Sequence, residues 1–401
     1  MSLLPVEDAL AKVIDGAQPQ LEEAVALHRA NGRVLSQPVD ARRTQPPFDA
    51  SAMDGYAVLS ADLSTIPVVL NVVGAAAAGT GFADELKSGQ AVRIFTGAPV
   101  PSGADTIVIQ ENTSRPSEAS VEIFEASAAG RHIRHRGLDF ATGDTLLEAG
   151  RVLDPAALSL AAAGNHADLM VWKKPLVALI ATGDELLLPG NELGPDQIIS
   201  SNAYGVGAII TQAGGQVLDL GIARDDREEI TFFVQKAMDA GADIIVTLGG
   251  ASVGDHDLVN HVLTDLGIEL DFWKIAMRPG KPLMFGKLGK TRCLGLPGNP
   301  VSSLICSHLF LKPLVRALAG LPPVSCERDA VLDVPMPAND GRQDYVRAYV
   351  VKQDGIFHAT PFATQDSSML RTLADANAAI IRRPGALPAL AGDPCRVLML
   401  R

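Results

Sequence analysis

Apolar positions follow a helical period at two places in the first part of the chain. Between these places they form short runs typical of β-strands. Residues 5–15 are predicted to form a helix because four apolar side chains share one face, namely Val6, Leu10, Val13 and Ile14. Residues 154–164 form a second predicted helix, with Asp154 as N-cap and Pro155 at the first helical position. Between them, residues 45–148 hold short apolar runs separated by Gly, Pro, Asn and Asp, at 66–73, 91–95, 105–110 and 121–124. A β-rich stretch between two helices indicates an insertion into a small N-terminal domain.

From residue 175 onward, predicted strands and helices alternate. The strands are expected at 176–181, 216–220, 243–248, 270–275 and 292–296, and the helices at 200–213, 227–240, 256–266 and 300–318. This alternation predicts a parallel, doubly wound α/β sheet. After a break at 320–323, the chain returns to predicted strands, at 330–334, 345–352, 356–359 and 396–400. We expect this last part to form a small β-barrel or sandwich.

These patterns divide the chain into four expected domains. Residues 1–44 and 141–174 would form the small helical domain, and residues 45–140 the inserted β-rich domain. Residues 175–322 would form the α/β domain and residues 323–401 the C-terminal β-barrel domain. A length of 401 residues is in keeping with two to four domains.

Charge and cysteine content narrow the classes of function. The formal net charge of −12 argues against sequence-independent nucleic-acid binding, but backbone N–H groups and a few local cations can still hold a small anion. The four cysteines form no CxxC pair, which favours reduced thiols over a zinc site. The chain opens without a basic segment followed by an apolar one, and Pro, Gly, Asn and His interrupt the uncharged run 293–311. We therefore expect a cytoplasmic protein without a membrane span.

Three motifs follow predicted strands of the α/β domain, at the strand ends where ligands bind in this type of sheet. They are TGDE at 182–185, GGASVGDHD at 249–257 and PGNPVS at 297–302. The glycines at 249, 250 and 254 allow the backbone to approach an anion closely, and the helix that follows adds unpaired N–H groups. A tight turn with a helix cap is the alternative explanation of the glycine-rich motif.

Charged side chains accompany these loops. Lys281 lies in the stiff RPGKP loop, with Lys274 and Arg278 nearby, and would contact phosphate or another oxyanion; a solvated cationic loop is the alternative. Carboxylates beside phosphate loops usually indicate Mg²⁺. Of the candidates, Asp184 and Asp255 suit helix N-caps, so Glu185 and Asp257 are the expected metal ligands. The histidines form no convincing metal cluster.

Seven motifs in this order produce a resemblance to a known family. They are PPFDASAMDGYA at 46–57, TGAPVPSGAD at 96–105, RHRGLDF at 134–140, TGDEL at 182–186, GGASVGDHD at 249–257, RPGKP at 278–282 and LPGNPVSS at 296–303. Together they resemble the signature motifs of the MoeA-type molybdopterin molybdenumtransferases, the family that includes the gephyrin E-domain. The resemblance spans nearly the whole chain.

The resemblance implies a specific reaction and assembly. The family transfers molybdenum from molybdate to adenylylated molybdopterin, requires Mg²⁺ and releases AMP. Its members are elongated homodimers of four domains, including a molybdopterin-binding α/β domain and a C-terminal β-barrel. The active cleft lies between the α/β domain of one subunit and the inserted β domain of the other. Further partners would be other molybdenum cofactor biosynthesis proteins, with neither nucleic acid nor membrane involved.

The resemblance also assigns roles to individual residues. The expected catalytic residues are Asp54, Asp139, Glu185, Asp225, Asp257, Lys274 and Lys281. The expected substrate contacts are Thr96, Arg134, Thr182, Gly249, Gly250, Ser252, Gly254, Arg278, Pro297, Gly298, Asn299, Arg342 and Ser368, the last two as candidate molybdate contacts. Two positions depart from the family pattern: Arg278 stands where many members have Lys, and Ser367-Ser368 where a Ser-Gly pair is common.

Three other functions compete with this one. A nucleotide-processing hydrolase sharing only residues 175–320 would have no need of the motifs at 46–57 and 96–105. A non-catalytic scaffold could lose the acidic and lysine positions, which are intact here. A tungstate-handling enzyme would share the whole pattern, because the two oxyanions are similar in size and charge.

Overall fold

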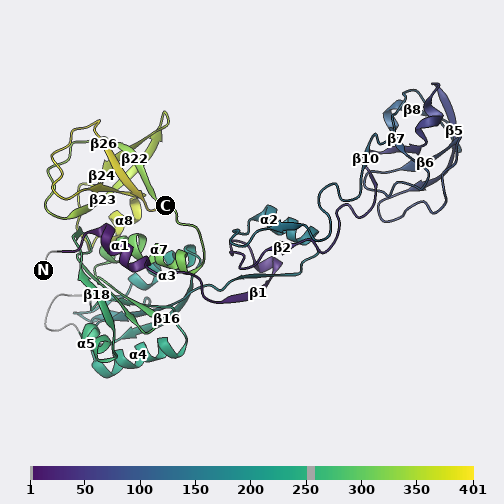
Figure 1. Ribbon diagram of the computed structural model, residues 1–401. Coiled ribbons are helices and arrows are strands. Elements are labelled where there is room, and N and C mark those ends of the chain that lie inside the picture. Colours follow the sequence, from purple (N-terminus) through teal and green to yellow (C-terminus); the bar gives the residue numbers. More distant parts are fainter. Residues whose placement is uncertain (1–2, 251–257) are drawn as a thin grey trace. The chain divides into compact units, whose positions relative to one another are not determined.

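The computed structural model describes residues 3–250 and 258–401, and these form two compact units. Unit 1 comprises Met1–Glu23, Gly32–Val34 and Trp172–Arg401, and unit 2 comprises Ala24–Asn31 and Leu35–Val171 (Figure 1).

Unit 1 contains an α/β domain built on a sheet with the strand order β16-β13-β17-β21-β20-β18. The strands are β13 (Leu176–Thr182), β16 (Gln216–Ala223), β17 (Ile244–Leu248), β18 (Glu269–Lys274), β20 (Pro282–Leu288) and β21 (Thr291–Leu296). The predicted all-parallel sheet is wrong at one strand: β20 runs antiparallel to both β18 and β21. This strand was not predicted, because it directly follows the Pro- and Gly-containing RPGKP loop. The remaining strands are parallel, as the alternating pattern indicated.

Helices cover both faces of this sheet and enclose a separate apolar core on each (Figure 1). They are α1 (Val6–Ile14), α3 (Asn202–Gln212), α4 (Arg227–Asp239), α5 (Leu258–Asp265), α6 (Pro300–Cys306) and α7 (Lys312–Leu318), with the π-helical segment Ser307–Leu311 joining the last two. Helix α1 buries Val6, Ala9 and Val13, whereas Ile14 is exposed, contrary to the predicted face.

The run from α6 to α7 is the single helix, within the part of the chain that the structure describes, that is long and apolar enough to cross a membrane. Of its most apolar window, 61% is buried. Val301, Phe310 and Leu314 are fully enclosed by the core of the α/β domain. This packing is typical of a core helix and agrees with the interrupted apolar pattern of the sequence.

A closed β-barrel completes unit 1. Its strands are β22 (Glu327–Leu332), β23 (Gln343–Gln353), β24 (Ile356–Pro361), β25 (Ala378–Arg382) and β26 (Pro394–Met399), and β25 pairs back onto β23 to close it. The short helix α8 (Leu370–Asp375) and strand β25 were not predicted. Strand β19 (Met277–Arg278), from the α/β domain, pairs in parallel with β23, so the barrel and the α/β domain share hydrogen bonds.

Unit 2 is rich in strands, as predicted for residues 45–148. Its largest sheet has the order β7-β4-β6-β5-β9-β8, formed by β4 (Gly55–Val58), β5 (Val68–Ala76), β6 (Gln90–Ile94), β7 (Thr106–Ile109), β8 (Thr113–Ser117) and β9 (Ser120–Ile123). The other elements are β1 (Glu22–Ala26), which begins in unit 1, β2 (Val39–Asp40), β3 (Ala50–Ser51), β10 (Ile133–Arg134), β11 (Thr145–Leu147), α2 (Pro155–Ala163) and β12 (Asp168–Trp172), which ends in unit 1. Helix α2 begins as predicted: Pro155 is its first residue, and the Asp154 carboxylate accepts a hydrogen bond from Ala157 N at 2.8 Å.

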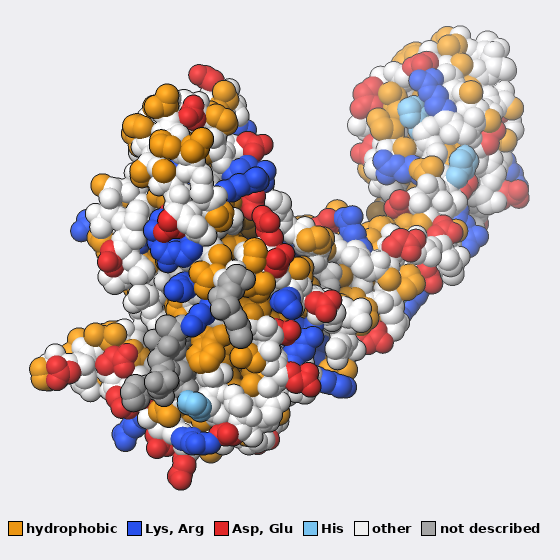
Figure 2. All heavy atoms as spheres, turned by 60° about the vertical axis from the view of Figure 1, so that its left-hand side comes forward, with side chains coloured by type: hydrophobic (Ala, Val, Ile, Leu, Met, Phe, Trp, Pro, Cys, Tyr) orange, Lys and Arg blue, Asp and Glu red, His pale blue; other side chains and the backbone are white. Residues whose placement is uncertain are grey.

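Side chains of both charges are interspersed with apolar ones over the face that Figure 2 shows. On this face, the described residues present no continuous basic surface of the kind that neutralises a nucleic-acid backbone.

Candidate functional site

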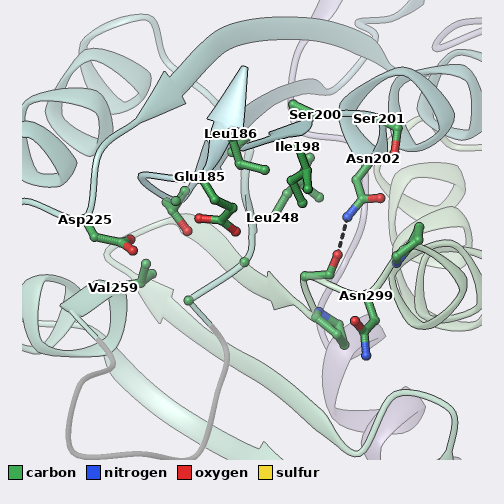
Figure 3. Close-up of a pocket in the computed structure, with 18 of the residues that line it drawn as sticks. Glu185, Leu186, Ile198, Ser200, Ser201, Asn202, Asp225, Leu248, Val259 and Asn299 are labelled. Atoms are coloured by element: carbon green, nitrogen blue, oxygen red, sulfur yellow. Dashed lines mark hydrogen bonds between the residues drawn. The ribbon is translucent and has the colours of Figure 1, made fainter. Parts of the chain in front are cut away.

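A cavity of about 700 Å³ lies at the carboxyl ends of β13, β17 and β21 (Figure 3). Its walls come from the loops after these three strands, from the start of α3 and from the barrel. Nine of the residues predicted from the sequence line it: Thr182, Glu185, Asp225, Gly249, Gly250, Pro297, Gly298, Asn299 and Ser368. Parallel strands end at the same edge of a sheet, which is why motifs far apart in the sequence meet here.

Glycines let the loop after β17 pass close to the end of β13. Gly249 has φ +110°, and a Cβ at this position would lie 2.7 Å from the carbonyl oxygen of Thr182. Gly250 has φ +64°, and its Cβ would lie 2.4 Å from a methyl carbon of Val259. Both the left-handed backbone and the close contacts therefore require glycine. The result is bare backbone at the cavity wall.

The loop after β21 is fixed by side-chain amides. Asn202 Nδ2 donates to the carbonyl oxygen of Gly298 at 2.8 Å (Figure 3). Asn299 Nδ2 donates to Ser367 Oγ at 2.9 Å. Val301 N donates to the Ser367 carbonyl at 3.1 Å. The side chain of Asn299 does not cap the N-terminus of α6, because its amide is hydrogen-bonded to Ser367 of the barrel domain. This loop thus joins the barrel to the cavity.

Acidic side chains gather on one side of the cavity. The carboxylates of Glu185 and Asp225 face the same space in Figure 3. Partial burial raises the pKa of Asp225, and the negative charges of Asp184 and Glu185 raise it further. The prediction that Asp184 caps a helix is wrong: a turn follows β13, and the Asp184 carboxylate accepts a hydrogen bond from Asp225 N at 3.2 Å. Negative charge is therefore concentrated here.

The barrel contributes Ser368, whose loop is held by a buried arginine. Asp366 Oδ1 accepts from both Ser368 N (2.8 Å) and Ser368 Oγ (2.6 Å). Arg347, which is 1% exposed, donates from Nη1 to the Asp366 carbonyl at 2.7 Å and from Nε to Gln365 Oε1 at 3.2 Å. Sequence reasoning missed Arg347, although an arginine at an inward position of a strand is a signal of buried polar contacts.

The predicted cationic residues lie outside the cavity lining. Lys274 and Lys281 are exposed, and they lie on neighbouring segments because Ile275 N donates to the Lys281 carbonyl at 3.1 Å. Pro282, which follows Lys281, does line the cavity. Both lysines are thus close to its rim along the chain, and their substrate contacts stay predictions.

The predicted arginines of this unit are engaged with carboxylates. Arg278 forms ion pairs with Asp344 and with Asp340, the latter at 3.0 Å, and Arg342 pairs with Asp340 at 3.3 Å. These bonds raise the pKa of Arg278, chiefly through Asp344. A role of either arginine in substrate binding stays a prediction.

Unit 2 brings two of its predicted residues together. Thr96 donates to Asp54 Oδ1 from its backbone N (2.7 Å) and from its hydroxyl (2.8 Å), and the two bonds lower the pKa of Asp54, the backbone bond most. Gly55 starts β4, where a Cβ would lie 1.9 Å from the Val108 carbonyl oxygen, so its place is set by strand pairing. Arg134 on β10 and Asp139 are both exposed in this unit.

Some predicted residues cannot be placed, and some cavity residues were not predicted. Ser252, Gly254 and Asp257 lie outside the described residues. In contrast, Ser200, Ser201 and Asn202 line the cavity but were not predicted. They precede or open α3 without glycine, proline or charge, so only their position after β15 (Ile198–Ile199) brings them to the cavity.

Comparison with known proteins supports the same family for the N-terminal, central and C-terminal parts of the chain. Residues 4–164 match the MoeA N-terminal region (domain I and II), residues 178–317 the probable molybdopterin binding domain, and residues 329–400 the MoeA C-terminal region (domain IV). A molybdopterin molybdenumtransferase of Bacillus subtilis is 35% identical over 99% of this chain and 94% of the relative. One of Haemophilus influenzae is 33% identical over 94% of both.

Solved structures agree with these matches. A molybdopterin biosynthesis MoeA protein of Pyrococcus horikoshii has a TM-score of 0.83 at 30% identity, with 100% of both chains covered. Another solved structure of a molybdopterin biosynthesis MoeA protein, from Pyrococcus horikoshii OT3, has a TM-score of 0.79 at 26% identity, and covers 99% of this chain and 100% of the other. The chain therefore belongs to the MoeA family, whose curated bacterial members are named molybdopterin molybdenumtransferases.

Proposed function

We propose that this molybdenum cofactor biosynthesis enzyme inserts molybdate into adenylylated molybdopterin in a Mg²⁺-dependent reaction that releases AMP. Family membership supports the transfer of molybdenum to molybdopterin. The observation that carries the finer proposal is the composition of the cavity, where glycine backbone, two acidic side chains and a hydroxyl of the barrel surround one space. These groups suit a phosphate-bearing substrate, a divalent cation and an oxyanion, respectively.

The glycine loops are suited to the phosphates of the substrate. The position of a Cβ on Gly298 would lie 3.8 Å from the Cα of Gly249, so two bare backbone segments run side by side. A phosphate can approach such backbone closely and accept hydrogen bonds from its N–H groups. A cavity of about 700 Å³ is also large enough for a nucleotide-linked pterin, since ligand sites commonly measure roughly 300–1,000 Å³.

The acidic side of the cavity fits Mg²⁺ only together with substrate. Within residues 3–250 and 258–401, no three acidic, histidine or cysteine side chains form a group that could hold a metal by themselves. Mg²⁺ commonly takes one or two carboxylates and completes its shell with phosphate oxygens and water. Glu185 and Asp225 fit this role: partial burial and, second, the negative charges of Asp184 and Glu185 raise the pKa of Asp225, and a bound cation would offset that repulsion. Bound there, Mg²⁺ would neutralise charge on the phosphates.

The chain's own residues would orient the second substrate. The hydroxyl of Ser368 is held at 2.6 Å by Asp366, which fixes its direction, and its loop is locked by Arg347 and by Asn299. Lys274 and Lys281, near the rim, would offset the charge of molybdate and of the departing phosphate. Positioning and charge compensation, rather than proton transfer, would then supply most of the rate acceleration.

The direct test measures AMP release from adenylylated molybdopterin in Mg²⁺, with and without molybdate. We expect release that requires molybdate, and molybdenum retained on the pterin. Glu185→Gln should lower the rate about a hundredfold, the lower end of the usual scale for a lost electrostatic contact in a reaction centre. Glu192→Gln is the matched control, because Glu192 is exposed and lies outside the cavity lining. Equal rates for the two variants would refute the role of Glu185.

The same assay tests Asp257, the second metal ligand expected from the sequence. Asp257→Asn should abolish AMP release and leave the oligomeric state unchanged. Normal turnover of this variant would show that the metal assignment is wrong.

We also propose that a second copy of the chain completes the site, through Asp54 and Thr96 of unit 2. The two hydrogen bonds that Thr96 donates favour the ionised form of the Asp54 carboxylate, which lies on the surface of this unit. Mixing inactive Glu185→Gln with inactive Asp54→Asn tests this idea. In a homodimer with shared clefts, mixed dimers contain one intact cleft, so about a quarter of the wild-type activity should return. No recovery after subunit exchange would place both residues in the cleft of a single subunit.

A further inference from the structure

A second cavity, of about 230 Å³, lies at the opposite edge of the α/β sheet. It is formed where β13, β17 and β21 begin, beside Pro175, Asp243 and Thr291. The segments 18–21 and 173–175, which adjoin the boundaries of unit 1, complete its wall. None of these residues belongs to the cavity at the carboxyl ends of the strands.

A buried arginine faces this cavity. Arg292 lines it and is 7% exposed, and its Nη2 donates to the carbonyl oxygen of Asp15 at 2.8 Å. Its Nε is buried without a hydrogen-bond partner. Among the ion pairs of the described residues, none includes Arg292. The carboxylate of Asp15 acts on Arg292 through its charge but forms no ion pair with it. Folding therefore leaves a buried guanidinium that is only partly compensated, which is unfavourable until an anion binds.

Three lysines surround the same space. Lys173, Lys174 and Lys290 are exposed and line the cavity with Arg292. The carboxylates nearby are those of Asp15 and Asp243, and Asp243 already accepts a hydrogen bond from Leu176 N at 2.7 Å. Four cations against two carboxylates leave an excess of two positive charges. This local excess contrasts with the net charge of −12 of the whole chain.

We propose that this second cavity binds a tetrahedral dianionic oxyanion, either phosphate or molybdate. The charge of such an ion matches the local excess, and guanidinium and ammonium groups are the usual partners of these oxygens. The volume accepts one such ion but is a third of that of the larger cavity. The site goes beyond the proposed reaction, because it lies at the far edge of the sheet. A bound ion would tie segments 18–21 and 173–175 to the start of β21 and stabilise unit 1.

The first test locates the ion. Crystals of the full chain, grown without phosphate or sulfate, would be soaked in tungstate, whose anomalous scattering marks its position. We expect a peak beside Arg292, separate from any peak near Ser368. A peak confined to the larger cavity, or no peak, would overturn the proposal even if the transferase assignment holds.

The second test measures binding. The double variant Lys174→Gln/Lys290→Gln removes two exposed cations, so its fold should persist, and Lys236→Gln on α4 is the control. In tungstate titrations, the affinity at this site should fall about tenfold in the double variant and stay unchanged in the control. Equal affinities for the two variants would refute the site. Displacement of tungstate by phosphate would identify phosphate as the ligand, and displacement by molybdate only would identify molybdate.

Discussion

Replacing Gly249 by alanine is the sharpest test of how the cavity wall is built. Gly249 has φ +110°, and a Cβ there would lie 2.7 Å from the Thr182 carbonyl oxygen and 3.0 Å from Thr182 Oγ1. The nearest atom belongs to the backbone at the end of β13, so it cannot rotate away. Gly249→Ala should therefore displace either the loop or the strand end that supports it.

The expected cost has two parts. A left-handed backbone costs a non-glycine residue about 1–2 kcal/mol, and overpacking against a fixed atom adds about 1–3 kcal/mol. We therefore expect the free energy of unfolding to fall by roughly 2–5 kcal/mol, with the loss partly relieved if the loop moves. Gly298→Ala is the control, because its Cβ would meet only the Cα of Gly249, at 3.8 Å, and its φ is not positive. Its cost should stay below about 1 kcal/mol.

Tryptophan fluorescence during urea unfolding can measure both variants. The two tryptophans of the chain, Trp172 and Trp273, belong to unit 1, so the signal reports on the unit that contains the substitution. Binding of adenylylated molybdopterin, measured in parallel, should weaken at least about tenfold for Gly249→Ala, since the loop would no longer present its backbone to the phosphates. If Gly249→Ala and Gly298→Ala lost the same free energy of unfolding, the close-approach argument would be refuted.

Three further substitutions test single interactions. The raised pKa of Asp225 means that its ionised form is disfavoured in the folded state, so the Asp225→Asn variant should be more stable than wild type at neutral pH. In thermal melts, this difference in stability should vanish as the pH falls below the normal pKa range of an aspartate. Arg347→Lys should lower the free energy of unfolding by about 2 kcal/mol in urea, because one ammonium cannot replace the forked contacts to Gln365 and Asp366. Thr96→Val removes a hydroxyl bond to Asp54 and should raise the pKa of that carboxyl in an NMR titration, whereas Thr80→Val should leave it unchanged.

The alternation of strands and helices predicted most of the α/β domain, and its failures have local causes. Strand β20 was missed because its apolar residues directly follow a loop rich in proline and glycine, although Gly289-Lys290 between two apolar runs is a hairpin signal. Helix α8 was missed because its six residues make fewer than two turns, too few for a helical period to show. Ile14 was wrongly assigned to the buried face of α1, which buries Ala9 instead. Which face of this helix is buried depends on the elements that pack against it.

The site was predictable where it depends on strand ends and unpredictable where it depends on pairing between domains. Glu185, Gly249 and Asn299 meet because parallel strands end together. Arg278, in contrast, forms ion pairs with carboxylates of the barrel because β19 pairs with β23. No local sequence pattern predicts this strand pairing. The role of Arg347 likewise depends on the path of the loop after β24.

The two edges of the α/β sheet carry unbalanced charge of opposite sign. At the carboxyl ends of the strands, burial and the neighbouring carboxylates of Asp184 and Glu185 raise the pKa of Asp225. At the starts of the strands, a buried guanidinium lies beside three lysines. Neither arrangement helps the chain to fold, because like charges repel and buried charges lose hydration. Each becomes favourable once a ligand of opposite charge is bound, a cation with phosphates at one edge and an oxyanion at the other. Ligands should therefore stabilise the folded chain by binding ions of opposite sign at the two ends of the strands. Mg²⁺ should act through Asp225, and an oxyanion should act through Arg292.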